Sequence, residues 1–234
     1  MKNKEVIQLT LSQQARYALS NQSVAVDRPL QQPLSQNIPA MIEELKTWCG
    51  TDNAGVAVSF FFRQYSLFIT AQFGLIHQHG GYFSVPWREL QFDRVHNYGL
   101  PLLQTHVKSS DFQMIAPHER HQAFHEILYR QVDELLTEFK KYIKISPITC
   151  WENVLGSVLW FYAGMESRDP RKAAEDMEWL LDSANWEPIK TSYMAKLLGD
   201  KPLQQAVSKP LRKTCCLYKE LPSFDTCTFC PKPN

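Results

Sequence analysis

The chain has 234 residues, of which 44% are hydrophobic and 21% are charged, and this composition is typical of a folded globular protein rather than a disordered one. Its 25 Lys and Arg residues nearly balance its 24 Asp and Glu residues, so the formal net charge is +1. Nucleic-acid-binding domains are usually strongly basic, and we therefore expect no nucleic-acid partner. The length suits one large domain, or one domain with a small addition.

The N-terminal residues 1–20 are polar and contain no apolar run like that of a signal peptide. The most apolar stretches, residues 56–62 and 154–164, are far shorter than the ~20 residues that span a bilayer. We therefore expect a soluble, cytoplasmic protein without a membrane span. In a reducing compartment, a local group of cysteines indicates a metal site or a redox centre more often than a disulfide scaffold.

The first two hundred residues are dominated by helical signals. A Gln-rich stretch comes first, over residues 1–38, and predicts a short starting element followed by an extended or loosely packed lead-in. Pro39 then suits the first turn of a helix that ends before Gly50. Apolar periodicity and capping residues predict helices at about 39–49, 124–142, 151–162 and 169–184. Residues 52–76 are apolar on most sides, so periodicity does not separate helix from strand there, and the length of the stretch favours one buried helix or a pair of helices.

The middle of the chain, from about 82 to 114, has a different pattern. Aromatic and β-branched residues are interrupted there by Pro86, by Asn97-Tyr98-Gly99 and by Pro101. This pattern predicts a small antiparallel sheet. The expected fold is therefore α+β, mainly helical, with a small antiparallel sheet in the middle of the chain and an irregular C-terminal segment.

We expect two parts: a mainly helical substrate-binding body over 1–200, and a C-terminal segment over 201–234 packed on it. Five prolines punctuate the second part and argue against long regular structure there. Between residues 201 and 219 it contains five basic residues and no acidic one.

Four of the six cysteines lie in this C-terminal segment, as Cys215-Cys216 and, after ten residues, Cys227-Thr228-Phe229-Cys230. A Cys-x-x-Cys pair can bind one metal ion, and both zinc sites and iron–sulfur loops use it. Adjacent side chains in an extended strand point to opposite faces, so Cys215 and Cys216 share a centre only where the backbone bends. A binuclear cluster relaxes this demand because its thiolates are spread over two irons. The spacing thus favours a [2Fe-2S] cluster over a zinc ion.

The sequence around these cysteines resembles the C-terminal signature of the FhuF-type ferric-siderophore reductases. The matching residues run from Arg212 to Tyr218 and from Cys227 to Pro231, with the ten-residue interval preserved, and Trp151-Glu152-Asn153 resembles an upstream Trp-x-Asn segment of the family. The resemblance covers about twenty residues and implies that Cys215, Cys216, Cys227 and Cys230 bind a [2Fe-2S] cluster.

The same resemblance implies an oxidoreductase that reduces Fe(III) in a ferric siderophore by one electron and releases Fe(II). Siderophores bind Fe(III) through hard oxygen donors and hold the softer Fe(II) far less tightly. A hydroxamate or citrate-hydroxamate siderophore is the expected partner. The chain contains no dinucleotide-binding fingerprint, so a separate electron donor is expected.

The basic residues Arg212, Lys213 and Lys219 are candidates for offsetting the negative charge of the cluster and for attracting an anionic substrate. Two other functions remain open at this point. In one, a zinc ion stabilises a binding module; in the other, an iron–sulfur cluster serves as a redox sensor.

The remaining cysteines and the histidines are interpreted structurally. Cys49 and Cys150 are expected to be small buried residues in helices. His118, His121 and His125 are expected to be solvated or to cap a helix, because no His-Glu-x-x-His motif is present. His77 and His79 are expected in a loop without a metal.

Overall fold

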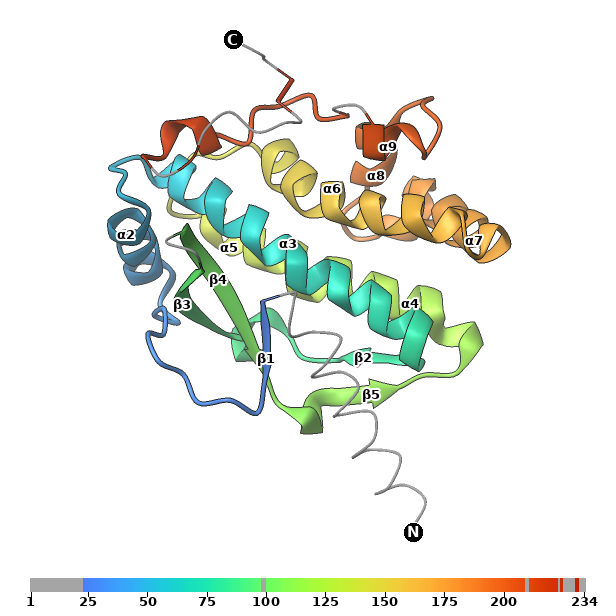
Figure 1. Cartoon of the computed structure of the whole chain (residues 1–234), viewed down its shortest axis with the longest axis horizontal. Helices are drawn as coiled ribbons and strands as arrows, with labels where there is room; N and C mark the ends of the chain where they lie inside the picture. Colours follow the sequence, from blue (N-terminus) through green and yellow to red (C-terminus); the bar gives the residue numbers. More distant parts are fainter. Residues whose placement is uncertain (1–22, 98–99, 209–210, 223, 225–229, 232–234) are drawn as a thin grey trace.

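The computed structural model describes residues 23–97, 100–208, 211–222, 224, 230 and 231, and these residues form a mainly helical protein with two small sheets (Figure 1). This confirms the predicted α+β class. The α-helices are α2 (Ile38–Cys49), α3 (Ala54–His79), α4 (Arg120–Glu126), α5 (Glu134–Lys140), α6 (Pro147–Glu166), α7 (Pro170–Leu181), α8 (Tyr193–Leu198) and α9 (Gln205–Ser208). The strands are β1 (Val24–Val26), β2 (Gly81–Phe83), β3 (Gln91–Asn97), β4 (Leu100–Val107) and β5 (Phe112–Met114).

Shorter helical turns connect these elements. A π-helical stretch, η4 (Ile127–Asp133), joins α4 and α5 into the one long helix that the periodicity predicts. The 3-10 turns are η1 (Trp87–Glu89), η2 (Ser109–Asp111), η3 (Pro117–Glu119), η5 (Ser183–Trp186) and η6 (Tyr218–Glu220).

Local signals set the ends of α2 and α3. Asn37 caps α2 by accepting a hydrogen bond from the backbone N–H of Ala40, and Asn53 caps α3 in the same way. Each helix ends at a glycine in the left-handed region, with φ of 68° at Gly50 and 63° at Gly80. These φ values favour glycine and explain where both helices stop. Helix α2 ends where the sequence predicts, whereas α3 continues beyond the expected end near residue 76, to His79.

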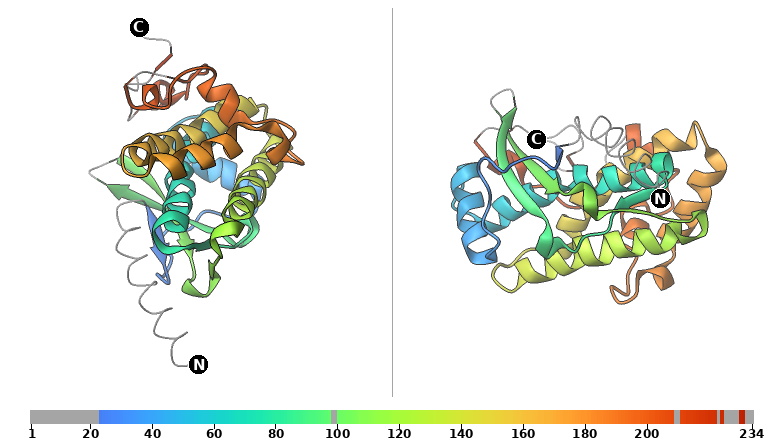
Figure 2. Two further views of the ribbon diagram at one scale, coloured as in Figure 1. Left: turned by 90° about the vertical axis from the view of Figure 1, so that its right-hand side faces the viewer. Right: turned by 90° about the horizontal axis from the view of Figure 1, so that it is seen from below.

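Helix α3 is the centre of the core. Its interior positions are buried on most sides, including Phe60, Phe61 and Phe62, which are all 0% exposed. Helix α6 packs along one side of α3, and strands β2 and β4 contact it from the other side (Figures 1 and 2). A helix that is apolar all round is stable in water only when it is covered on all sides, as α3 is here.

The larger sheet has the strand order β1-β4-β3. Strands β3 and β4 form the predicted antiparallel pair, with Gln91 opposite His106. Strand β1 pairs with β4 in parallel, with Val24 opposite Thr105, so the sheet is mixed. The smaller sheet pairs β2 with β5 around Gly81, where a Cβ atom would lie 2.5 Å from the carbonyl oxygen of Gln113.

Of the two expectations for the lead-in, extended or loosely packed, its described part, residues 23–37, is extended at β1 and is not loosely packed. Besides forming β1, this stretch is fixed by the carboxylate of Asp93, which accepts hydrogen bonds from the backbone N–H groups of Gln31 (2.7 Å) and Gln32 (2.5 Å). The backbone N–H of Leu34 donates to the carbonyl of Phe92, and the Leu34 side chain is buried. These contacts are made by single residues and leave no periodic pattern in the sequence.

Candidate iron–sulfur site in the cysteine loop

We call residues 211–222 the cysteine loop; in Figure 1 it crosses the outer side of α3 and α6. Glu152 on α6 holds the start of this loop. Its side chain is buried, and its carboxylate accepts hydrogen bonds from the backbone N–H groups of Lys213 (3.0 Å) and Thr214 (2.9 Å) and from the Thr214 hydroxyl. A buried carboxylate is stable only when such donors replace its water. Glu152 thereby fixes the two residues that precede Cys215.

A second anchor holds the loop at Cys216. The hydroxyl of Ser59 on α3 donates to the carbonyl oxygen of Cys216 at 2.8 Å. The side-chain amide of Asn153 donates to both the hydroxyl and the carbonyl oxygen of Ser59, at 2.9 Å each. Ser59 and Asn153 are both 0% exposed. Glu152 and Asn153 are neighbours on α6. Glu152 therefore holds the residues just before the cysteine pair, and Asn153 holds the carbonyl of Cys216 through Ser59 of α3.

The backbone bends directly after the two cysteines. Leu217 has a φ of 64°, in the left-handed region, and its N–H points back to the sulfur of Cys215 at 3.4 Å. Backbone N–H groups that donate to cysteine sulfur stabilise the thiolate form and tune iron–sulfur centres. Cys215 is half-buried and Cys216 is buried, so the pair lies at the boundary between core and solvent. The donor fits a cluster-binding thiolate at Cys215, whereas the bend lies after the cysteine pair and not between its two members.

Aromatic packing fixes the far end of the loop. Tyr218 stacks on Phe60 of α3 with ring centroids 5.6 Å apart, and Phe224 contacts both rings. The Tyr218 hydroxyl accepts a hydrogen bond from the side-chain amide of Gln64 at 2.8 Å, and burial raises the Tyr218 pKa above its ordinary value. Leu221 is buried beside this group. The described part of the interval between the two cysteine pairs is thus packed onto α3.

The predicted ligands are only partly within the described residues. Cys215, Cys216 and Cys230 are described, and Cys230 is half-buried. Cys227 lies outside the described residues. Among the residues that are described, no three His, Cys, Asp or Glu side chains form a group that could hold a metal ion.

The three basic candidates differ in exposure. Arg212 is only 8% exposed, and its Nε donates to the carbonyl of Thr214 at 3.4 Å, within the cysteine loop. Lys213 and Lys219 are exposed. The burial of Arg212 favours a role in holding the loop, whereas Lys213 and Lys219 are accessible to a dissolved anion.

The two cysteines outside the segment are buried, as predicted. Cys49 is 6% exposed and Cys150 is 0% exposed. Burial raises the pKa of each thiol to about 12, so neither is a reactive thiolate at neutral pH. Cys49 also packs beside Leu221 and so contributes to the surface on which the cysteine loop rests.

Sequence reasoning missed the residues that hold the loop. Glu152 and Asn153 lie in the segment that carries the resemblance, but no role followed from the sequence. Ser59 is the one polar residue in the apolar run 56–62, and this isolation is a usable signal for a buried hydrogen bond. Gln64 gives no comparable signal because polar residues on helices are usually solvated.

A buried ionic group connects four helices, α3, α4, α6 and α7, at the end of α3 far from the cysteine loop. Asp176 on α7 is 0% exposed, and burial alone would raise its pKa; the hydrogen bond and charge of His77 and the charge of Arg120 instead lower the pKa below its ordinary value. The partners of its carboxylate are His77 Nε2 (2.7 Å), Arg120 Nε (2.7 Å), His121 Nε2 (3.2 Å) and the Tyr162 hydroxyl (3.1 Å).

This group corrects the interpretation of two histidines. His77 lies on α3, not in a loop, and its side chain is 6% exposed. His121 stacks on Trp179 with centroids 5.4 Å apart and pairs with Asp176, so it is not a solvated residue. The errors have two causes. The helix was expected to end before His77, and the acidic partner of both histidines lies on a helix some fifty or more residues away, which only the packing of α7 brings near.

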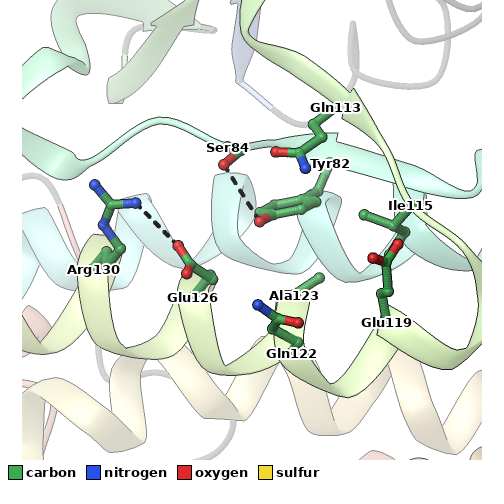
Figure 3. A pocket seen from close by; sticks show the side chains of 9 residues that line it. All are labelled: Tyr82, Ser84, Gln113, Ile115, Glu119, Gln122, Ala123, Glu126 and Arg130. Carbon is green, nitrogen blue, oxygen red and sulfur yellow. Dashed lines mark hydrogen bonds and ion pairs between the residues drawn. The ribbon is translucent and has the colours of Figure 1, made fainter.

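A polar pocket of about 180 Å³ lies between the small sheet and α4, on the side of α3 away from the cysteine loop (Figures 1 and 3). Two pairs of its polar groups bond to each other: the Tyr82 hydroxyl donates to Ser84 at 3.4 Å, and Arg130 pairs with Glu126 at 3.1 Å. Figure 3 shows these pairs on opposite walls of the pocket. Because the pocket lies on the other side of α3 from the cysteine loop, it is not part of the candidate site.

Comparisons of the chain with protein-family models, with curated proteins and with solved structures found no match. Among the described residues, no helix has the length and apolar character needed to cross a membrane. The cysteine loop and its contacts with α3 and α6 therefore provide the basis for a functional proposal.

Proposed function

We propose that the protein is a cytoplasmic ferric-siderophore reductase of the FhuF type, with a [2Fe-2S] cluster held by Cys215, Cys216, Cys227 and Cys230. One observation carries this proposal. The two segments on which the resemblance rests, Trp151-Glu152-Asn153 and residues 212–218, are joined by hydrogen bonds. The Glu152 carboxylate accepts from the backbone of residues 213 and 214, and Asn153 donates to Ser59, which donates to the carbonyl of Cys216. The two segments are about sixty residues apart in the sequence, resemble the same family and lie in contact in the structure, which supports a shared role in one site.

The residues of the chain have separate tasks in this function. Glu152, Ser59 and Asn153 orient the cysteine pair, and the N–H of Leu217 stabilises the Cys215 thiolate. Tyr218 and Phe224 keep water from the inner side of the loop. A [2Fe-2S] cluster, when bound, supplies a one-electron carrier whose potential depends on such hydrogen bonds and on exposure.

The net reaction takes one electron from a separate donor protein and places it on the iron of the substrate. Fe(III) bound to the siderophore becomes Fe(II), which the hard oxygen donors hold weakly and release, and the siderophore is left intact. The substrate class is a hydroxamate or citrate-hydroxamate siderophore. A carboxylate-bearing citrate-hydroxamate complex is anionic, and exposed Lys213 and Lys219 attract it to the loop.

The test begins with protein purified without oxygen. We expect about two irons per chain and visible absorption that bleaches on reduction, both properties of a [2Fe-2S] cluster. The reduced protein should be reoxidised by a ferric hydroxamate siderophore, with Fe(II) trapped by a chelator. Colourless protein with one zinc ion would support the zinc-stabilised binding module instead. Bound iron without reoxidation by hydroxamate, citrate-hydroxamate or catecholate complexes would support the redox sensor.

Matched cysteine variants separate ligands from buried thiols. Replacing any of Cys215, Cys216, Cys227 or Cys230 by Ser should abolish or weaken the visible spectrum, because each is a proposed ligand. Cys49→Ala and Cys150→Ala should leave the spectrum unchanged, since both thiols are buried and protonated. A normal spectrum in Cys215→Ser or Cys216→Ser would contradict the ligand assignment.

A further inference from the structure

A second, smaller pocket lies beside the start of the cysteine loop, between α6 and α8. Its volume is about 110 Å³. Trp151 and Leu197 form apolar walls, together with the half-buried ring of Tyr193. Lys196 and Lys213, both exposed, also line it. The pocket therefore combines a largely apolar lining with two lysine side chains.

The charges around this pocket favour an anion. Glu152 lines it as well, but its carboxylate is already occupied by the backbone of the cysteine loop. The ammonium of Lys196 lies 5.1 Å from the centre of the Tyr193 ring, and within the described part of the chain neither Lys196 nor Lys213 makes an ion pair. Asp133 is the other acidic group near enough to act on Tyr193, whose pKa is raised chiefly by burial.

The donors that a ligand in this pocket can reach are the two lysine ammonium groups. Trp151 is 0% exposed and stacks on Tyr193 with ring centroids 5.0 Å apart, so it supplies an apolar wall and its indole N–H is covered. Two ammonium groups beside an apolar wall suit a carboxylate on a short apolar stem.

The size and place of the pocket restrict what it holds. A dry cavity of about 150 Å³ accommodates one benzene ring, so 110 Å³ leaves room for a single short group and not for a whole siderophore. Lys213 is two residues before Cys215, which keeps their Cα atoms within about 7 Å of each other. A group held here is therefore adjacent to the proposed cluster ligands.

We propose that this pocket is an anion subsite for a carboxylate on a short apolar stem. In a substrate it would hold one carboxylate-bearing arm of the ferric complex, and this part of the proposal rests on the proposed reductase function. The subsite makes the enzyme selective for carboxylate-bearing complexes, of which the citrate-hydroxamate type is an example, over complexes with neutral arms. Lys196 and Lys213 pair with the carboxylate, and Trp151 and Leu197 contact the stem.

The first experiment measures binding without any redox reaction. Butyrate and its neutral analogue butyramide are titrated into the full-length protein as purified, and saturation-transfer NMR follows the ligand signals. Butyrate should bind at least about fivefold more tightly than butyramide, as expected for a partly exposed ion pair. Equal affinities, or no binding of butyrate, would overturn the proposal.

Variants identify the site of binding. Lys196→Met should weaken butyrate binding about fivefold, whereas Lys201→Met, a matched exposed lysine outside the pocket, should have no effect. Ile148→Trp at the pocket wall should block binding by filling the space, and Ile148 is 37% exposed, so the fold tolerates this change. Unchanged butyrate binding in Lys196→Met or in Ile148→Trp would assign the binding to another place and refute the subsite.

The second experiment links the subsite to the substrate. Reduced protein is mixed with a ferric citrate-hydroxamate complex and with its carboxylate ester, and Fe(II) release is followed. Lys196→Met should raise KM about fivefold for the free carboxylate with little change in kcat, and should leave the ester unaffected. Equal effects on both complexes would count against the subsite. Absence of reduction of every complex would refute the reductase function, while butyrate binding would still decide the subsite.

Discussion

Glu152 is the residue whose placement most directly serves the proposed site. It brings a carboxylate into the interior of the protein, where three donors from the cysteine loop replace its water. The loop in turn gains a fixed conformation just before Cys215. One side chain thus links the position of α6 to the position of a proposed ligand.

We expect Glu152→Gln to loosen the loop. Glutamine keeps the shape of the side chain, but its NH₂ group would face backbone N–H donors, so at least one buried hydrogen bond is lost. The free energy of unfolding should fall by about 2 kcal/mol, as measured by urea denaturation. Iron bound per chain should fall as well.

Glu178→Gln provides the control for this change, because Glu178 is exposed on α7. It should change the free energy of unfolding by less than about 0.5 kcal/mol and leave the iron content intact. Full iron content and unchanged stability in Glu152→Gln would show that the carboxylate does not hold the loop.

Helix α3 supports the cysteine loop along one stretch and the general core along another. Near its beginning, Phe60 packs against Tyr218 and Phe224 of the C-terminal region. Further along, Phe73 stacks on Phe124, with ring centroids 4.6 Å apart. Both phenylalanines are 0% exposed, so they form a matched pair with different partners.

Phe60→Ala and Phe73→Ala should therefore differ in their local effects. Each should lower the free energy of unfolding by about 3 to 5 kcal/mol, because each leaves a large cavity. Only Phe60→Ala should increase amide hydrogen exchange in residues 216–221, since it alone removes the surface beneath them. Equal protection of these residues in both variants would mean that α3 does not anchor the loop.

The Asp176 group acts across the whole molecule because its members come from four helices, α3, α4, α6 and α7. Removing one partner of a buried charge is strongly destabilising, whereas in the intact group the attraction between the partners offsets the cost of burying the charge. The group lies at the end of α3 opposite to the one that carries Ser59 and Phe60. It fixes how α7 and α4 pack on the central helix.

Stability should depend on the ionisation of Asp176. The pKa of Asp176 in the folded protein is below its ordinary value of 3.8. The ionised carboxylate therefore adds its full share to the free energy of unfolding above pH 3.8, and this share is lost as the pH falls through the lower pKa of the folded protein. Asp176→Asn should be about 3 kcal/mol less stable at pH 7 and should lose less stability between about pH 5 and pH 3. Urea denaturation across this pH range measures both effects.

The neighbouring variant Glu175→Gln is the control, because its carboxylate is half-exposed and pairs with Arg120 at the surface. It should change the free energy of unfolding by less than about 1 kcal/mol and keep the pH dependence of the original protein. An Asp176→Asn protein with that same pH dependence would show that Asp176 is not the group that titrates.

The sequence alone determined the local features of this protein. Helix ends follow from Asn37 and Gly50 because capping energies depend on a few neighbouring residues, and the buried character of α3 follows from its apolar composition. The spacing of the cysteines favoured a [2Fe-2S] cluster over zinc, and the resemblance to the reductase family implied its four ligands.

Only the tertiary structure decided which distant polar groups meet. Glu152 and Thr214 are 62 residues apart, Ser59 and Cys216 are 157 apart, and β1 joins the sheet through a parallel pairing with β4. A polar residue on a helix has the same local pattern whether it is solvated or buried against a partner. The free energy that distinguishes the two comes from packing of complete elements, so the support of the proposed site became visible only when α3, α6 and the cysteine loop were seen together.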